Sequence, residues 1–178
     1  MYSPSLFILG KGCMQPNIIL TKAVRGLSPR RLANFVTAAG RAVGIRGAVT
    51  VLVTGNREIL SLNTQFKCSK HSTDVLSFPA PDFVEGFAGD IAISRDIAAR
   101  NARLLGHSVA DEIRVLALHG ILHLAGYDHE SDGGEMAIKE QNLRKRLGLP
   151  ASLIERTSGE QRRHVKAKPR VRPARSRT

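Results

Sequence analysis

The chain has 178 residues, enough for one domain with a sizeable core but not for two domains of ordinary size. Its formal net charge of +12 favours polyanionic partners such as nucleic acid or acidic lipid. The two cysteines, Cys13 and Cys68, are far apart in sequence and cannot form a disulfide framework of the secreted kind. The chain also lacks a run of about 18 apolar residues, the length needed to span a bilayer. We therefore expect a cytoplasmic protein without a membrane segment.

Most of the basic charge lies at the C-terminal end. Residues 156–178 contain nine Lys or Arg and one acid, Glu160, a net charge of +8 that leaves +4 for residues 1–155. The segment has almost no apolar side chains and is predicted to be a disordered basic tail, which could bind RNA phosphates or serve only for solubility. Residues 1–16 hold prolines and glycines without periodicity and are predicted to be a loose leader. The predicted domain covers residues 17–155.

The first predicted elements alternate between strand and helix. Residues 17–24 are rich in Ile, Leu and Val and predict a strand. A Ser-Pro pair then begins a helix over residues 28–44, with a glycine as its stop. Residues 48–53 form a β-branched run that predicts a second strand. Asn56 is the expected N-cap of a second helix, which extends over residues 56–65.

The second half of the predicted domain is mainly helical. Residues 74–78 and 90–93 predict two strands, which could pair as a hairpin or lie apart. A serine caps a helix over residues 94–106, a Ser-x-x-Asp capping pattern begins an apolar helix over residues 108–126, and a Gly-Gly break precedes a last helix over residues 135–147. The expected fold class is α+β, a small mixed β-sheet packed with about five helices in a single domain.

Three of the six histidines, His119, His123 and His129, lie within eleven residues. Residues four apart share one face of a helix about 6 Å apart, so the first two can bind one ion at about 2.0–2.1 Å. Gly126 can adopt the left-handed conformation that ends the helix and turns the chain, so that the third histidine can return to the same ion. A lone histidine on an apolar helix is more often a core residue, but three at these offsets predict a zinc site. Three protein ligands leave the fourth position open to water, as in catalytic zinc sites.

The same offsets occur in metzincin proteases, whose pattern is H-E-x-x-H-x-x-G-x-x-H. Their glutamate is the general base of peptide hydrolysis, and this chain has Gly120 in its place. A peptidase would need a base from another element, which disfavours that activity. A bound metal can still polarise a phosphoryl oxygen and lower the pKa of bound water to about 7, so phosphodiester cleavage remains open.

Three runs in this order resemble the YbeY family of bacterial endoribonucleases, the rRNA maturation factors: Thr73–Pro79 (TDVLSFP), Gly89–Ser94 (GDIAIS) and His119–His129 (HGILHLAGYDH). The resemblance covers about residues 17–150. It implies a single-domain α+β fold, cytoplasmic location, and one zinc ion on His119, His123 and His129, which would act on single-stranded RNA through metal-bound water. It also implies maturation of the 3′ end of small-subunit (16S) rRNA and ribosome quality control, with the small ribosomal subunit as partner.

The chain departs from the family pattern between its second predicted helix and the first of the three runs. The family usually has an arginine after an aromatic at this point, and this chain has Phe66-Lys67. Lysine keeps the positive charge but lacks the bidentate fork that suits phosphate, and Lys67 is predicted to contact an RNA phosphate. His71 also departs from the expected lead-in and is interpreted as a surface histidine.

Four carboxylates are candidates for supporting roles. Asp74 and Asp90 are each expected to begin a strand and to fix a turn through backbone amides rather than to act in catalysis. Glu112 lies seven residues before His119, where a solvated face is preferred over a role beside the metal. Glu140 lies on an otherwise apolar helical stripe and needs a partner, which could be the second ring nitrogen of a zinc-bound histidine.

The segment before the third histidine and the function itself leave alternatives open. Asp128 could form a turn or take part in metal chemistry, and Tyr127 could stack on a base, although packing over the helix end is the simpler interpretation. The leading hypothesis is a zinc-dependent single-strand endoribonuclease. The alternatives are a ribosome-assembly or RNA-binding factor with a mainly structural zinc, and a metallopeptidase.

Overall fold

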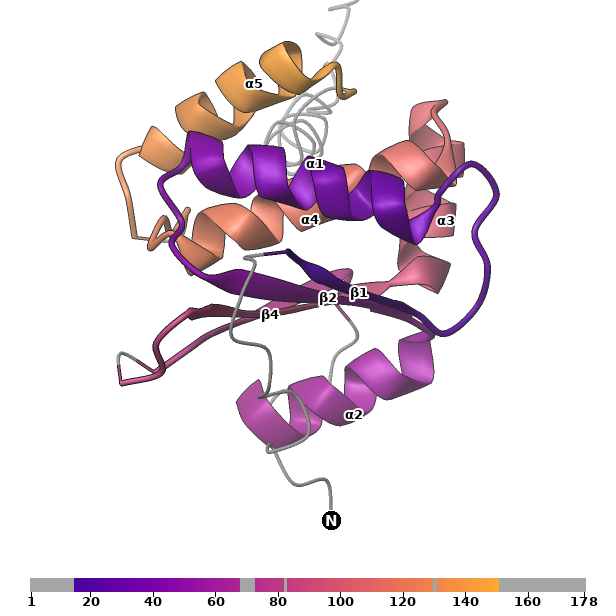
Figure 1. Ribbon diagram of the computed structural model, residues 1–178. Helices are drawn as coiled ribbons and strands as arrows, with labels where there is room; N and C mark the ends of the chain where they lie inside the picture. The colour runs from indigo at the N-terminus through magenta and orange to yellow at the C-terminus, as the bar shows by residue number, and fades with distance from the viewer. Residues whose placement is uncertain (1–14, 68–72, 82, 130, 151–178) are drawn as a thin grey trace, which may run out of the picture.

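A four-stranded mixed sheet separates the helices into two layers (Figure 1). The computed structural model describes residues 15–67, 73–81, 83–129 and 131–150. The strands, in the sheet order β1-β2-β4-β3, are β1 (Asn17–Leu20), β2 (Ala48–Thr54), β4 (Phe87–Ser94) and β3 (Val75–Pro79). The first three run parallel, and β3 pairs antiparallel with β4 at the edge of the sheet. The predicted α+β class is therefore confirmed.

The helices lie mainly on one side of this sheet. They are α1 (Pro29–Ala42), α2 (Asn56–Lys67), α3 (Arg95–Leu105), α4 (Val109–Leu124) and α5 (Glu135–Leu147). Figure 1 shows α1, α4 and α5 on one face and α2 alone on the other, while α3 packs against α4. Among the described residues, no helix is both long enough and apolar enough to cross a membrane.

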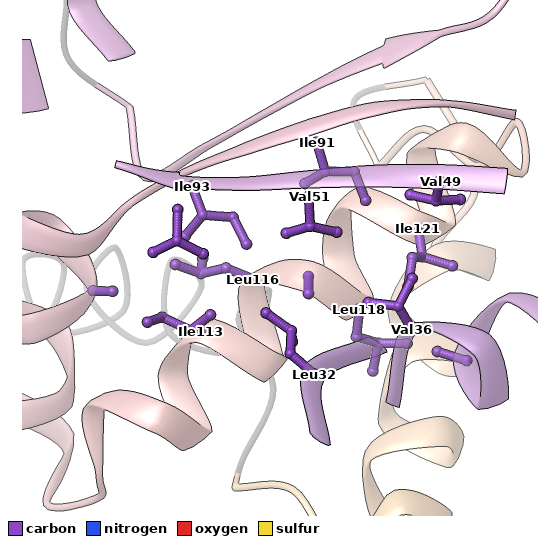
Figure 2. Packing of buried hydrophobic residues seen from close by; sticks show 14 of the residues in the cluster. Leu32, Val36, Val49, Val51, Ile91, Ile93, Ile113, Leu116, Leu118 and Ile121 are labelled. Atoms are coloured by element: carbon purple, nitrogen blue, oxygen red, sulfur yellow. The ribbon is translucent and has the colours of Figure 1, made fainter. Parts of the chain in front are cut away.

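The main core lies between the sheet and helices α1 and α4 (Figure 2). Alternate strand residues face this side because side chains alternate across a strand, and Val51, Ile91 and Ile93 are completely buried there. Helix α4 is buried around most of its circumference, from Ile113 to Leu122, which explains why its sequence is almost uniformly apolar. A smaller cluster beneath α2 covers the other face of the sheet.

Serine side chains begin three of the helices, as predicted. The hydroxyls of Ser28, Ser94 and Ser108 accept the backbone N–H three residues later at 3.2, 3.2 and 3.0 Å. These bonds satisfy N–H groups that have no partner within the helix. At the other ends of α3 and α5, Gly106 and Gly148 adopt the left-handed conformation.

The prediction that Asn56 caps α2 is wrong. Asn56 is the first residue of the helix, and its backbone N–H donates to a carboxylate oxygen of Asp96 at 2.9 Å. This bond, with a second from Arg95, holds the pKa of the Asp96 carboxyl below its ordinary value. The Asn56 side chain instead accepts the Ser94 hydroxyl at 3.1 Å. The start of α2 is therefore capped by α3, a contact that no local sequence pattern reveals.

Strand β4 begins at Phe87, three residues before its predicted start. Asp90 consequently lies inside the strand, and the expectation that it begins a strand and fixes a turn is wrong. The preceding Gly89 resembles a strand breaker, but with a φ of 141° it still pairs with Val49 and Pro79, directly after a register shift between β2 and β4. A Cβ there would lie 2.4 Å from the Phe78 carbonyl oxygen. Strands β3 and β4 pair with each other, so of the two arrangements that the sequence allowed, a pair or two separate strands, the pair is observed. Strand β1 ends at Leu20, four residues before its predicted end.

Candidate metal centre

The three histidines meet at the C-terminal end of α4. The Nε2 atoms of His119 and His123, on one face of the helix, lie 3.1 Å apart. The ring centroid of His129, from the α4–α5 connection, lies 5.3 Å from each of the other two. Each histidine has one ring nitrogen that lies within 4.8 Å of a ring nitrogen of both other histidines. Two nitrogens bound at about 2.05 Å to a tetrahedral ion are about 3.3 Å apart, so the 3.1 Å between the Nε2 atoms of His119 and His123 fits a single ion.

The turn after α4 returns the third histidine to the first two. Gly126 has a φ of 87°, and its N–H donates to the His123 carbonyl at 3.0 Å. The N–H of Tyr127 donates to the Leu122 carbonyl at 3.1 Å, which satisfies another carbonyl at the helix end. The Tyr127 ring packs against the main core, so the simpler interpretation of this residue is confirmed.

Asp128 stabilises the next bend of the connection. Its carboxylate accepts the Ser131 hydroxyl at 2.8 Å, and its carbonyl accepts the backbone N–H groups of Ser131 and Asp132 at 3.2 and 2.9 Å. Asp132 in turn accepts the N–H of Met136 in the first turn of α5 at 2.7 Å. These bonds fix the segment that carries His129, so the turn-forming role of Asp128 is observed.

Burial decreases from one histidine to the next. His119 is buried, His123 is half-buried and His129 is exposed, so the cluster is open to solvent on one side. Within the described part of the chain, no fourth His, Cys, Asp or Glu joins the group. An ion held here would keep a coordination position for water or substrate, the arrangement of catalytic rather than structural zinc sites.

Glu140 of α5 contacts the innermost histidine. Its Oε2 atom lies 3.0 Å from His119 Nδ1, and the Glu140 side chain is 0% exposed. A histidine that donates its Nδ1–H to a carboxylate presents Nε2 to a metal in a fixed orientation. The hypothesis that Glu140 binds the second nitrogen of a metal-site histidine is thus supported by direct contact.

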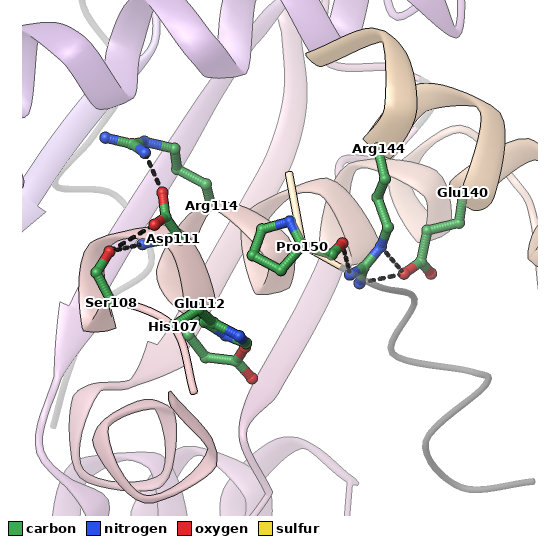
Figure 3. A network of polar contacts seen from close by, with 8 residues as sticks. All are labelled: His107, Ser108, Asp111, Glu112, Arg114, Glu140, Arg144 and Pro150. Carbon is green, nitrogen blue, oxygen red and sulfur yellow. Dashed lines mark hydrogen bonds and ion pairs between the residues drawn. The ribbon is translucent and has the colours of Figure 1, made fainter. Parts of the chain in front are cut away.

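Arg144, one turn further along α5, completes this buried network (Figure 3). Its Nε donates to Glu140 Oε1 at 2.8 Å, and another guanidinium nitrogen donates to the Pro150 carbonyl at 2.9 Å. Burial raises the pKa of the Glu140 carboxyl, but the bond from His119 and the charge of Arg144 outweigh burial and leave that pKa below its ordinary value of 4.5. The carboxylate is therefore charged at neutral pH. Sequence analysis did not identify Arg144, although its i,i+4 spacing from Glu140 was a usable signal.

Gly120 lies where α4 packs on the sheet. A Cβ at this position would meet Ile91 Cγ2 at 2.8 Å and Ser77 Oγ at 3.1 Å. The Ser77 hydroxyl also donates to the Gly120 carbonyl at 3.3 Å. No larger side chain fits between the helix and the sheet without displacing one of them, so the base of the metzincin pattern has no space in this fold.

Of the remaining predicted residues, Glu112 and Asp74 do not belong to the histidine group, and the side chains of the others are not described. The prediction of a solvated face at Glu112 is wrong, because this residue is fully buried and its carboxylate lies 2.7 Å from His107 Nε2, near the start of α4 (Figure 3). Asp74 directly precedes β3. Lys67 is the last residue of α2, but its side chain is not described, and His71, residues 1–14 and residues 151–178 also lie outside the described residues. The phosphate contact of Lys67 stays a prediction.

Comparisons with known proteins agree on one family. The family model described as Endoribonuclease YbeY matches residues 21–148. A relative from Koribacter versatilis named Endoribonuclease YbeY is 53% identical over 86% of this chain and 99% of its own length. A relative of the same name from Helicobacter pylori (strain P12) is 38% identical over 79% of this chain and 89% of its own. A solution structure from Thermotoga maritima, 28% identical, superposes with a TM-score of 0.51 and covers 88% of this chain and 99% of that one.

Proposed function

The chain belongs to the Endoribonuclease YbeY family, and from this premise we propose that it is a zinc-dependent endoribonuclease that cleaves single-stranded RNA. The observation that carries the zinc dependence is the convergence of three histidines, with Nε2 atoms 3.1 Å apart on α4 and a solvent-open side at His129. The whole cluster lies inside the residues that match the family model.

The roles of the residues follow from their surroundings. His119, His123 and His129 would hold the ion. When bound, the ion supplies a Lewis acid for a phosphoryl oxygen and lowers the pKa of water. Glu140 fixes the His119 ring and contributes a buried negative charge next to the site. The exposed side at His129 is where an RNA phosphate would enter, and we propose Lys67 as a further phosphate contact.

Membership of this family supports a proposal for the cellular substrate. We propose the 3′ end of the small-subunit rRNA as the substrate, the small ribosomal subunit as the partner, ribosome quality control as a second role, and the cytoplasm as the location. A net charge of +12 is compatible with an RNA partner.

Metal analysis and RNA cleavage test the enzyme proposal. Purified protein should contain one zinc per chain and should cleave single-stranded RNA, and both a chelator and His123→Ala should abolish cleavage. His164→Ala, which removes a histidine from the predicted tail, is the matched control and should behave as the wild type. Cleavage that survives loss of the metal would contradict the proposal. Zinc binding without cleavage would favour a structural zinc, and cleavage of peptides but not RNA would favour a metallopeptidase.

The basic tail is proposed to add RNA affinity without sequence preference. Deleting residues 156–178 removes a net charge of +8 and should flatten the dependence of RNA affinity on salt, while the zinc content stays unchanged. The same salt slope for both proteins would contradict a tail that binds RNA.

A further inference from the structure

A pocket of about 370 Å³ lies at the same end of α4 as the histidines. Its walls come from the α1–β2 connection, the β3–β4 connection and the last residues of α4. Most of the lining residues are apolar in type, among them Val43, Ile45, Pro81, Val84, Phe87 and Leu124, but the surface that the lining exposes to the pocket is mainly polar. Arg46 is the one charged side chain that the described lining residues provide. Pockets that bind small organic groups have volumes of about 300–1,000 Å³.

The two connections that form the walls are joined to each other. The N–H of Ala48 donates to the Gly86 carbonyl at 2.8 Å, and Ala48 pairs in register with Phe87. Gly47 has a φ of 119°, and a Cβ there would lie 2.9 Å from the Phe87 backbone, so only glycine permits this close approach. The walls are therefore fixed by the fold and do not depend on a ligand for their shape.

The pocket and the proposed metal site share the end of α4. Leu124 and Ala125 line the pocket and directly follow the ligand His123. Successive helical residues point about 100° apart, so the pocket and the histidine face lie on neighbouring sides of the same helical turn. A strand with one phosphate at the histidines can place an adjacent nucleotide at the pocket.

We propose that this pocket binds the base of a nucleotide that flanks the scissile phosphate, and that Arg46 contacts the phosphate of that nucleotide. This inference rests on the proposed ribonuclease function. The polar atoms exposed on the walls can hydrogen-bond to the edge of a base, while the apolar side chains between them can contact its face. The planar guanidinium of Arg46 matches a phosphate, and within the described part of the chain it forms no ion pair that would compete.

An abasic scan of RNA binding tests the pocket. Single-stranded RNA decamers, each lacking one base and carrying phosphorothioate linkages that slow hydrolysis, are titrated with the full-length zinc-loaded protein by fluorescence anisotropy, and gels confirm that the RNA stays intact. For the wild type, loss of the base at one position, or at two adjacent positions, leaves polar groups of the pocket without partners and should weaken binding about 5- to 150-fold. Cleavage mapping on the intact RNA should place that position beside the cut.

Two variants connect this effect to the pocket. Val84→Trp fills the pocket and should remove the sensitivity to the missing base, whereas Phe83→Trp, at an adjacent residue that is 85% exposed and not part of the lining, should retain it. Arg46→Ala should lower the slope of log affinity against log salt by about 0.7, the value for one phosphate contact on a single strand. Arg30→Ala, which replaces an exposed arginine at the opposite end of α1, should leave this slope unchanged.

The outcomes separate this inference from the proposed function. Equal binding of all abasic RNAs, or a Val84→Trp protein with wild-type sensitivity, would overturn the pocket assignment even if the RNA is cleaved. Absence of zinc-dependent cleavage with an intact abasic effect would overturn the nuclease proposal alone. If Val84→Trp does not fold, Arg46→Ala decides, because a surface substitution with an unchanged salt slope contradicts the phosphate contact.

Discussion

Replacing Glu140 by glutamine tests whether the buried carboxylate sets the affinity of the histidines for zinc. The amide oxygen of glutamine can still accept the His119 Nδ1–H over the observed 3.0 Å, so the ring can keep its orientation. The negative charge is lost, however, and with it the electrostatic contribution that makes the ring a stronger ligand. We expect the dissociation constant for zinc to rise about 10- to 100-fold, which is about 1.4 to 2.7 kcal/mol.

The same substitution removes the ionic partner of Arg144, whose side chain is only 2% exposed. Breaking a buried ion pair from one side costs about 3–5 kcal/mol of unfolding free energy, because the remaining charge is left buried. Arg144→Met in the Glu140→Gln background removes that charge and should restore part of the stability. It should not restore zinc affinity, since the carboxylate is still absent. Stability and metal affinity therefore respond differently in the double variant.

A competition titration with a chromophoric chelator measures the zinc affinity, and thermal unfolding of the chelator-treated protein measures the stability without metal. Glu135→Gln is the matched control, because it makes the same exchange at an exposed position of the same helix and should leave zinc affinity unchanged. A folded Glu140→Gln protein that binds zinc as tightly as the wild type would refute the role given to this carboxylate. Recovery of zinc affinity in the double variant would show that Glu140 acts only through the packing of α5.

Three further substitutions test the surroundings of the site. Gly120→Ala should destabilise the protein by up to about 3 kcal/mol in urea unfolding, because the new methyl would meet Ile91 at 2.8 Å, whereas Gly133→Ala meets nothing within 4 Å and serves as the control. Unchanged stability would mean that α4 can move away from the sheet. Burial raises the pKa of the Asp90 carboxyl, with a hydrogen bond from Thr50 opposing it, so the folded state disfavours the charged form and stability falls as pH rises from 3.8 through the raised pKa. Asp90→Asn should therefore melt at a higher temperature than the wild type at pH 7 and lose that advantage below about pH 3.8, and the same difference at both pH values would contradict this. Ser94→Ala should lower the free energy of unfolding by about 1–2 kcal/mol in chemical denaturation, because α3 loses its N-cap. A smaller loss than that of Ser28→Ala, which removes an exposed cap, would argue against this role of Ser94.

Local signals in the sequence predicted most helices, because the groups that begin and end a helix are close in sequence. Ser108 caps α4 as predicted, and α5 ends at Leu147, the last residue of the predicted helix. Where a terminus depends on a distant partner, the prediction failed. The first N–H of α2 is bound by Asp96, forty residues away. The start of β4 was missed because Gly89 resembles a breaker until its close approach to β3 is known.

The site shows the same division between local and distant information. The spacing of His119 and His123 is a property of one helix, and Gly126 marks the turn after it, so this part was predictable. Glu140 was identified because a carboxylate on an apolar stripe requires a partner. Arg144 was missed because it lies in the basic run Arg144–Arg146, where a solvated side chain is the usual expectation. Only the packing of α5 on α4 distinguishes it from its neighbours.

The packing of α4 also explains why histidine offsets shared with peptidases belong to a different chemistry here. In the metzincin pattern the residue after the first histidine is the catalytic glutamate. In this fold that residue, Gly120, faces the sheet, where Ile91 and Ser77 leave no room for a side chain. The close contact between helix and sheet removes the position of the peptidase base, while the two ligands lie on another side of α4, where His119 contacts Glu140 of α5. The spacing of the histidines therefore specifies a metal site, while the surface on which their helix packs restricts the reactions that the site can perform.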